Sequence, residues 1–247
     1  MKKIFTRLTI LAATTLLLTQ CNKKDDFTSE PVEDYLQLQV GKYVIYRLDS
    51  MKFENLDTLK SSYQAKDEID GQMTDNLGRP SWRVVRYLRD VAGTQAWIPS
   101  VTYMVTSVKG TVEVIENNFR YLKLKEPINE GFSWKGNTYI SLYSSDPDWD
   151  FRYLDDWDYL YENVGADFTT LAGSIPNTIT VNQRDEVLGI PTDPMGYSEQ
   201  NSSIEVYGKG IGLIYKNFLH MQYQPASGGN PPYRIGYGIK MNMISHN

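Results

Sequence analysis

The sequence predicts a mainly β protein, with an antiparallel, curved sheet that either closes toward a barrel or divides into two packed sheets. Apolar and polar residues alternate with a period of two in several stretches, which is typical of half-buried strands. Glycine-containing turns separate these stretches, and no long stretch has a convincing helical period. We therefore expect little helix beyond the N-terminal segment.

The clearest strand is predicted near the C-terminus. From Tyr233 to Met243 every odd position is aromatic or apolar, and every even position is Arg, Gly, Lys or Asn. Weaker alternation marks three other strands: Val44, Tyr46 and Leu48; Val101, Tyr103 and Val105; Ile211, Leu213 and Tyr215. The predicted turns are residues 75–78, 90–93, 109–110 and 227–232.

Composition allows a folded domain of considerable size. The chain has 247 residues, of which 41% are hydrophobic and 22% charged, so it can bury a core as one β domain or as two small subdomains. The formal net charge is −5. A nucleic-acid partner is disfavoured, because phosphate binding requires a basic face.

The N-terminus has the pattern of a secretory signal peptide over residues 1–20. Lys2, Lys3 and Arg7 form a positive region, and an apolar stretch follows from Leu8 to Leu18. That stretch is too short for the ~20 residues of a membrane-spanning helix. Cleavage after Gln20 would remove three basic residues and no acidic residue, which takes the net charge from −5 to −8.

Cys21 is the single cysteine of the chain. A lone cysteine in an exported protein cannot form an internal disulfide, so it is free, paired between chains or modified. Leu18-Thr19-Gln20-Cys21 resembles the lipobox of bacterial lipoproteins, in which the cysteine is acylated after cleavage. This resemblance implies that Cys21 carries acyl chains, palmitate among them. An ordinary signal peptide followed by a free Cys21 is the alternative.

The residues after Cys21 resemble a further signal. Lys23, Lys24, Asp25 and Asp26 look like the lysine-plus-acidic export signal that sends Bacteroidetes lipoproteins to the outer face of the outer membrane. The resemblance implies an outer-membrane lipoprotein exposed at the cell surface, with the periplasmic face as the alternative. Residues 21–34 are expected to form a lipid-anchored acidic tether, and residues 35–247 the β-rich domain.

Two motifs in the domain resemble an uncharacterised group of Bacteroidetes lipoproteins. Residues 40–50, VGKYVIYRLDS, are similar to a VGxYWVYxxDS opening, and residues 208–216, GKGIGLIYK, are similar to a GxGLVYK-like strand. The likeness spans roughly residues 35–244. It implies a family without an assigned activity, so it contributes no catalytic residues.

Motifs for catalysis or for cofactor binding are missing from the sequence. His220 and His246 have no partner at metal-ligand spacing, and the chain has no HExxH, GxSxG or Walker sequence. We read residues 208–213 as a tight turn or β-bulge rather than a phosphate loop. We expect no cofactor and no catalytic histidine, and His220 is interpreted as a surface or hydrogen-bonded side chain.

One segment, residues 144–162, concentrates acidic and aromatic side chains. If its backbone is extended, the aromatic residues lie on one face and most acids on the other. The first interpretation is structural, with the aromatics in the core. The second is a recognition strip in which rings stack on sugars, with Trp149, Tyr153, Trp157 and Tyr159 as ligand-binding residues. The third is a calcium site at Asp146, Asp148 and Asp150, although glycine and glutamate are missing where an EF-hand needs them.

These observations together predict a lipid-anchored, β-rich envelope protein that acts by binding or as a structural component. Its expected partners are the membrane, through the anchor, and a glycan or another envelope protein. The alternative is a carboxylate-dependent hydrolase acting on glycans or peptides, which requires two carboxylates at a set separation. The sequence favours a protein without enzymatic activity.

Overall fold

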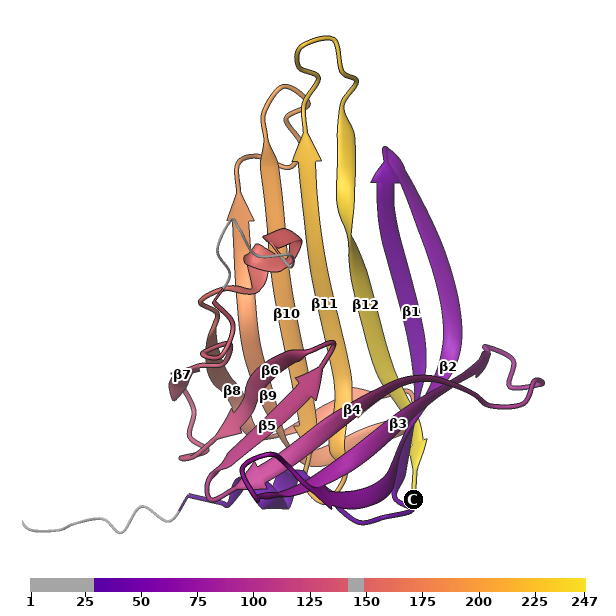
Figure 1. Ribbon diagram of the computed structural model, residues 1–247, viewed down its shortest axis with the longest axis vertical. Coiled ribbons are helices and arrows are strands. Elements are labelled where there is room, and N and C mark those ends of the chain that lie inside the picture. Colours follow the sequence, from indigo (N-terminus) through magenta and orange to yellow (C-terminus); the bar gives the residue numbers. More distant parts are fainter. Residues whose placement is uncertain (1–28, 142–148) are drawn as a thin grey trace, which may run out of the picture.

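A computed structural model describes residues 29–141 and 149–247. It contains one antiparallel sheet of twelve strands, in the spatial order β6-β5-β4-β3-β2-β1-β12-β11-β10-β9-β8-β7. The sheet curves into a nearly closed barrel, with β3 to β6 lying across the front of the long strands in Figure 1. The predicted fold class is therefore confirmed, and the barrel-like alternative is the one observed.

The strands are β1 (Tyr43–Asn55), β2 (Asp57–Thr74), β3 (Pro80–Asp90), β4 (Ile98–Val108), β5 (Thr111–Glu116), β6 (Phe119–Lys125), β7 (Ser133–Lys135), β8 (Asp158–Thr170), β9 (Gly173–Leu188), β10 (Ser198–Gly208), β11 (Gly212–Gln224) and β12 (Tyr233–His246). Two short 3-10 helices, η1 (Val32–Tyr35) and η2 (Trp149–Leu154), complete the described elements. The four stretches predicted as strands lie in β1, β4, β11 and β12. All four predicted turns lie in connections between consecutive strands: β2–β3, β3–β4, β4–β5 and β11–β12.

The C-terminal strand β12 occupies the middle of the sheet. It pairs with β1 on one side and β11 on the other, so the first and last strands are neighbours. Asn247 extends this contact, since its side-chain Oδ1 accepts a hydrogen bond from Tyr43 N at 2.8 Å. The strongest alternation in the sequence thus belongs to a strand with partners on both sides.

The edge strands β6 and β7 approach each other and nearly close the barrel. Leu122 N, on β6, donates a hydrogen bond to Gly136 O just after β7, at 2.7 Å. The indole of Trp134 donates to Leu122 O at 2.8 Å. These contacts satisfy backbone groups that an open sheet edge would leave to water.

The barrel is filled by a large aromatic cluster and a smaller aliphatic one. The first includes Trp134, Trp157, Tyr159, Tyr161 and Phe218, with the indole of Trp134 4.6 Å from the ring of Tyr161. The second surrounds Tyr46 and Met243. Large aromatic side chains bury roughly 150 to 250 Å² each, so they dominate the energetics of such a core.

The folded domain begins earlier than Tyr35, the start expected from the sequence. Val32 is fully buried, and Val32 N donates to Glu126 Oε1 at 3.1 Å. Ile128 N donates to Ser29 Oγ at 2.7 Å. Residues 29–34, which the composition placed in the tether, therefore pack against the end of the barrel.

The expectation of one extended segment through residues 149–161 is wrong in its first half. Residues 149–154 form η2, and β8 begins at Asp158. The odd-numbered aromatics therefore do not share a single strand face. Tyr153 reaches the core from a helical turn, whereas Tyr159 and Tyr161 reach it from β8.

Candidate functional site

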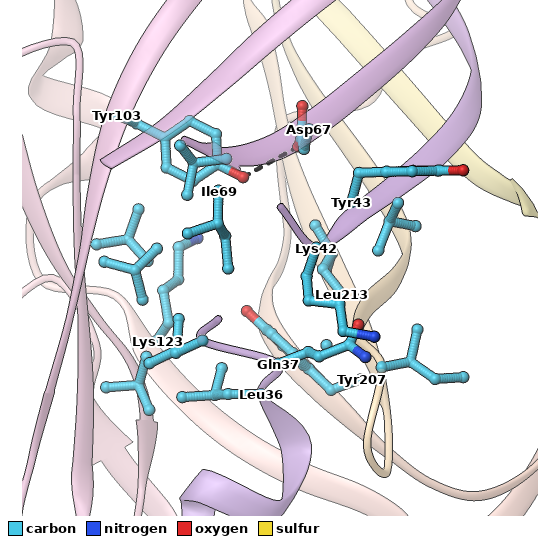
Figure 2. Close-up of a pocket in the computed structure, with 18 of the residues that line it drawn as sticks. Leu36, Gln37, Lys42, Tyr43, Asp67, Ile69, Tyr103, Lys123, Tyr207 and Leu213 are labelled. Atoms are coloured by element: carbon cyan, nitrogen blue, oxygen red, sulfur yellow. Dashed lines mark hydrogen bonds between the residues drawn. The ribbon is translucent and has the colours of Figure 1, made fainter. Parts of the chain in front are cut away.

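The interior of the barrel contains a cavity of about 130 Å³ beside the N-terminal segment. Figure 2 shows side chains from distant parts of the chain around this space, among them Leu36, Ile69, Tyr103 and Leu213. One wall is apolar and is formed by Leu36, Leu38, Val44, Ile69, Val84, Val105, Val112, Val114, Ile211 and Leu213. Charged groups and tyrosines form the rest of the lining. We call this space the apolar cavity.

A second space of about 320 Å³ adjoins the first and is lined by rings. Its aromatic residues are Tyr121, Phe151, Trp157, Tyr159, Phe218 and Tyr237. We call it the aromatic cavity. Four charged residues, Arg86, Glu116, Lys123 and Lys216, line both spaces, so these side chains stand at the junction of the two cavities.

Glu205 is the centre of the first charged cluster at this junction. Its carboxylate is 2% exposed, and Oε1 lies 2.8 Å from Lys123 Nζ and 3.2 Å from Lys216 Nζ. Oε2 accepts hydrogen bonds from Gln183 Nε2 at 2.8 Å and Tyr207 Oη at 2.7 Å. The strands β6, β9, β10 and β11 all contribute to this cluster, which ties opposite sides of the barrel together.

The pKa of Glu205 follows from these contacts. Burial alone would raise it, but the charges of Lys123 and Lys216, together with the hydrogen bonds to the carboxylate, lower the pKa to about 2. Glu205 is therefore ionised at neutral pH and is unsuited to donate a proton as a general acid.

Arg86 forms the second charged cluster. Its Nε and Nη2 both donate to the Asp67 carboxylate at 2.7 Å, and its Nη1 lies 3.6 Å from Glu116. Tyr103 Oη donates to Asp67 at 3.0 Å. Burial would lower the pKa of Arg86, but the charge and hydrogen bonds of Asp67 raise it well above its ordinary value. The Arg86 guanidinium is thus already matched by carboxylates.

The wall of the apolar cavity next to the N-terminus is formed by Leu36, Gln37 and Leu38, which belong to the connecting residues 36–40. Their backbone hydrogen bonds are local, such as Leu36 N to Glu33 O, and Gly41 N makes the first bond to the sheet, to Ile69 O at 2.8 Å. Gln37 lines the cavity, and its Oε1 is buried with no hydrogen-bond partner among the described residues. Such an orphan acceptor costs roughly 1 to 3 kcal/mol unless a ligand or water satisfies it.

Lys42 lines the same cavity beside Gln37 and is partly exposed (Figure 2). Among residues 29–141 and 149–247, Lys42 has no ion-pair partner. The apolar cavity is therefore bordered by four cationic side chains, Lys42, Arg86, Lys123 and Lys216, and by three acidic ones, Asp67, Glu116 and Glu205.

His220 lies outside both cavities, packed beneath η2. Its ring stacks on Tyr153 with centroids 3.5 Å apart, and Nδ1 lies 2.7 Å from Asn201 Oδ1. His220 is thus buried and hydrogen-bonded. Of the two interpretations from the sequence, a surface or a hydrogen-bonded side chain, the structure shows the second. Burial lowers its pKa to about 4, against the opposing charge of Glu199, while Arg152 adds to the lowering.

This pKa predicts a loss of stability in mild acid. The folded protein holds His220 neutral, whereas the unfolded chain binds a proton below pH 6.5, its ordinary pKa. The stabilisation is complete above pH 6.5 and falls by about 2 to 3 kcal/mol as the pH approaches 4. We expect denaturant titrations to show this loss in the wild type and in a His246→Gln control but not in His220→Gln. Equal acid sensitivity of all three proteins would contradict the prediction.

The structure describes some of the predicted site residues and not others. Cys21, Lys23, Lys24, Asp25 and Asp26 lie outside the described residues, as do Asp146 and Asp148. Trp149 begins η2 and Asp150 is exposed. In the described part of the chain, no cluster of three or more His, Cys, Asp or Glu side chains could hold a metal ion.

Three of the four proposed sugar-binding aromatics, Tyr153, Trp157 and Tyr159, are buried rather than arranged as a surface strip. Tyr153 is 8% exposed, Trp157 2% and Tyr159 1%. Trp157 and Tyr159 line the aromatic cavity, so the structure turns two of the four residues toward an internal space. Tyr153 instead covers His220.

The charged junction was missed in the sequence analysis. Lys123 and Glu205 are 82 positions apart, and neither belongs to a motif. A charged residue between apolar neighbours, as at Glu205 in Ile204-Glu205-Val206, is the one local signal, and surface positions of ordinary strands share it.

Known proteins give structural matches to this chain but no sequence matches. No family model matches it, and no curated protein does. A crystal structure of a protein from Parabacteroides distasonis, provisionally called a lipoprotein, has 10% sequence identity and a TM-score of 0.34, covering 86% of this chain and 98% of that one. A DUF1329 family protein from Desulfovibrio piger has 13% identity and a TM-score of 0.21, covering 89% and 93%.

One negative finding bears on the relation to a membrane. Within residues 29–141 and 149–247, no helix is both long enough and apolar enough to cross a bilayer.

Proposed function

We propose that this chain is a lipid-anchored outer-membrane protein, facing the cell exterior, whose barrel holds a small amphipathic molecule. The observation that carries the proposal is the pair of adjoining internal cavities that meet at the same four charged side chains. Small-molecule sites are typically concave and mostly apolar, with a few convergent polar groups. The membrane and a second envelope protein are the partners expected for the anchored form.

The dimensions of the cavities support a small ligand. A cavity of about 150 Å³ in another protein holds benzene, so the apolar cavity of about 130 Å³ fits a short alkyl group. The aromatic cavity, at about 320 Å³, offers room for a ring or a head group. A ligand with both parts would occupy the two spaces together.

The charged groups in the interior favour binding over hydrolysis. Hydrolysis by a carboxylate pair needs one acid that is protonated near neutral pH. Glu205 has a pKa of about 2, and Asp67 accepts hydrogen bonds from two nitrogens of Arg86. These carboxylates support the structure of the junction and bind cations of the protein itself.

We expect a ligand to enter the cavity past residues 36–40. This part of the cavity wall makes local backbone hydrogen bonds only, so moving it disrupts no pairing of the sheet. It also carries the unpaired Gln37 Oε1, which would accept a hydrogen bond from a ligand hydroxyl or amide.

Filling the apolar cavity tests the proposal. Leu38→Trp places a larger side chain in the space, and we expect it to lower the affinity for an added alkyl amphiphile at least about tenfold. Native mass spectrometry of protein purified from membranes would report the bound molecule. Leu56→Trp is the matched control, because Leu56 is 50% exposed on the β1–β2 turn. Equal retention by both variants, or no binding by the wild type, would refute an internal site.

The anchor is tested by Cys21→Ser. If Cys21 carries acyl chains, the variant should leave the detergent phase and appear in the soluble fraction, because each buried methylene contributes ~0.8 kcal/mol to membrane binding. Replacing Lys23, Lys24, Asp25 and Asp26 with alanine should keep the protein membrane-bound but protect it from external protease. Unchanged partitioning of Cys21→Ser would disprove the anchor, and continued protease sensitivity would disprove the export signal.

A further inference from the structure

We infer that the barrel binds an anionic amphiphile, whose carboxylate or phosphate group lies between Lys123 and Lys216 at the junction of the two cavities. The inference rests on the proposed function and specifies its ligand.

Lys123 and Lys216 share a single counter-ion. They extend from β6 and β11, on opposite sides of the barrel, and both approach Glu205 Oε1, at 2.8 Å and 3.2 Å. Their side chains are 9% and 20% exposed. Two shielded ammonium groups and one carboxylate leave a local surplus of one positive charge, which is costly away from water unless another anion balances it.

The two ammonium groups also have unused hydrogen-bonding capacity. Each carries three N–H bonds, and Lys123 donates one of them to Glu205. The Glu205 carboxylate itself is saturated, because Gln183 and Tyr207 occupy its other oxygen. The remaining N–H groups belong to side chains that line both cavities, so an anion in either space can accept them.

Arg86 is the poorer candidate for the same role. Its guanidinium already binds Asp67 through two nitrogens and has Glu116 at 3.6 Å, so one cation there faces two carboxylates. Over the whole junction the charges balance, but they are unevenly placed. An anion is attracted to the lysine side and repelled from the Arg86 side, which fixes its orientation.

The lining of the apolar cavity suits the alkyl chain of such a ligand. The apolar cavity accepts an alkyl chain, and Lys42 at its border adds a further positive charge. Placing the anion at the lysines lets the chain point toward Leu36, Leu38 and Leu213. A neutral amphiphile would fill the same apolar space but leave the surplus charge unmatched.

The test compares ligands that share eight carbon atoms and differ in the head group, which is neutral in one and anionic in two. Full-length protein in phosphatidylcholine nanodiscs is titrated calorimetrically with octanol, octanoate and octyl phosphate, and empty nanodiscs provide the blank. We expect both anions to bind about tenfold more tightly than octanol, since hydrogen bonds to charged groups contribute roughly 1.5 to 3 kcal/mol. The ratio between octanoate and octyl phosphate distinguishes a carboxylate ligand from a phosphate ligand.

Two variants should move the affinity for anions in opposite directions. Lys216→Met removes one ammonium while keeping the Lys123–Glu205 pair, and should weaken octanoate about tenfold. Glu205→Gln removes the competing carboxylate and should tighten octanoate by a similar factor. Octanol binding should stay unchanged in both variants, which also shows that they are folded. Lys52→Met is the matched control, because Lys52 is 64% exposed and lines neither cavity.

The outcomes separate this inference from the proposed function. If no octyl compound binds the wild type, the internal binding site itself is refuted. If octanol binds but the anions bind no more tightly, or if Lys216→Met affects octanol and octanoate equally, the anion site is refuted and the amphiphile site stands.

Discussion

Trp157→Ala is expected to lower the free energy of unfolding by about 3 to 5 kcal/mol, as large aromatic truncations in protein cores do. Trp157 is 2% exposed, its ring lies 6.3 Å from that of Phe218 in a stacked arrangement, and its indole N–H donates to Tyr153 O at 2.5 Å. Alanine would leave a cavity at the centre of the aromatic cluster and an unpaired carbonyl at the end of η2. Chemical denaturation followed by tryptophan fluorescence would measure the loss.

Trp97 provides the matched control for this measurement. It is partly exposed on the connection between β3 and β4, where it stacks on the Arg89 guanidinium, 4.2 Å from the ring centroid. Trp97→Ala should cost about 1 kcal/mol, because it removes two partly exposed cation–π contacts, with Arg89 and Lys66, and little buried area. A Trp157→Ala protein as stable as the Trp97→Ala protein would show that Trp157 is not a core residue.

Lys123→Met should be the second most destabilising change, with a loss of roughly 3 kcal/mol at neutral pH. The substitution keeps the aliphatic volume but removes the closer of the two cations that neutralise buried Glu205. Glu205→Gln in the same chain should restore most of the loss, because the amide still accepts hydrogen bonds from Gln183 and Tyr207 without a charge. Recovery in the double variant would identify the unpaired charge as the cause.

The pH range of this effect follows from the pKa of Glu205. The folded-state pKa of about 2 lies below the ordinary value of 4.5, so the stabilisation by its charge is complete above pH 4.5 and is lost as the pH falls toward 2. Lys135→Met is the control, since Lys135 is 50% exposed in its pairs with Asp156 and Asp158. It should leave the free energy of unfolding nearly unchanged, because solvent-exposed ion pairs contribute little to stability. A loss from Lys123→Met that persists unchanged at pH 2 would contradict the ion-pair explanation.

Local patterns in the sequence were sufficient to predict the fold class. The alternation from Tyr233 to Met243 and the turn at residues 227–232 depend on the two-residue period of a strand and on the conformational freedom of glycine, and both are properties of a few neighbouring residues. The role of residues 208–213 as a turn was within the same reach, whereas the sequence left His220 open between a surface and a hydrogen-bonded side chain.

The long strand β2 shows where local patterns were insufficient. It runs for 18 residues, yet charged and polar residues interrupt its alternation, and one of them, Asp67, points into the barrel. A charge on the inner face is tolerated because Arg86 pairs with it from the neighbouring strand. The two-residue period records apolar burial only, so a strand whose inner face contains ion pairs is not recognised.

Antiparallel strands joined by tight turns could be predicted from the sequence, because strand period and turn chemistry are encoded within a few residues. The tertiary structure alone decided that these strands curve into one barrel and that Lys123, Glu205 and Lys216 meet between two cavities. Their meeting depends on strand order and sheet curvature, which bring together residues 82 positions apart. No local signal marks such pairs, since the energy that joins them exists only after the barrel has closed.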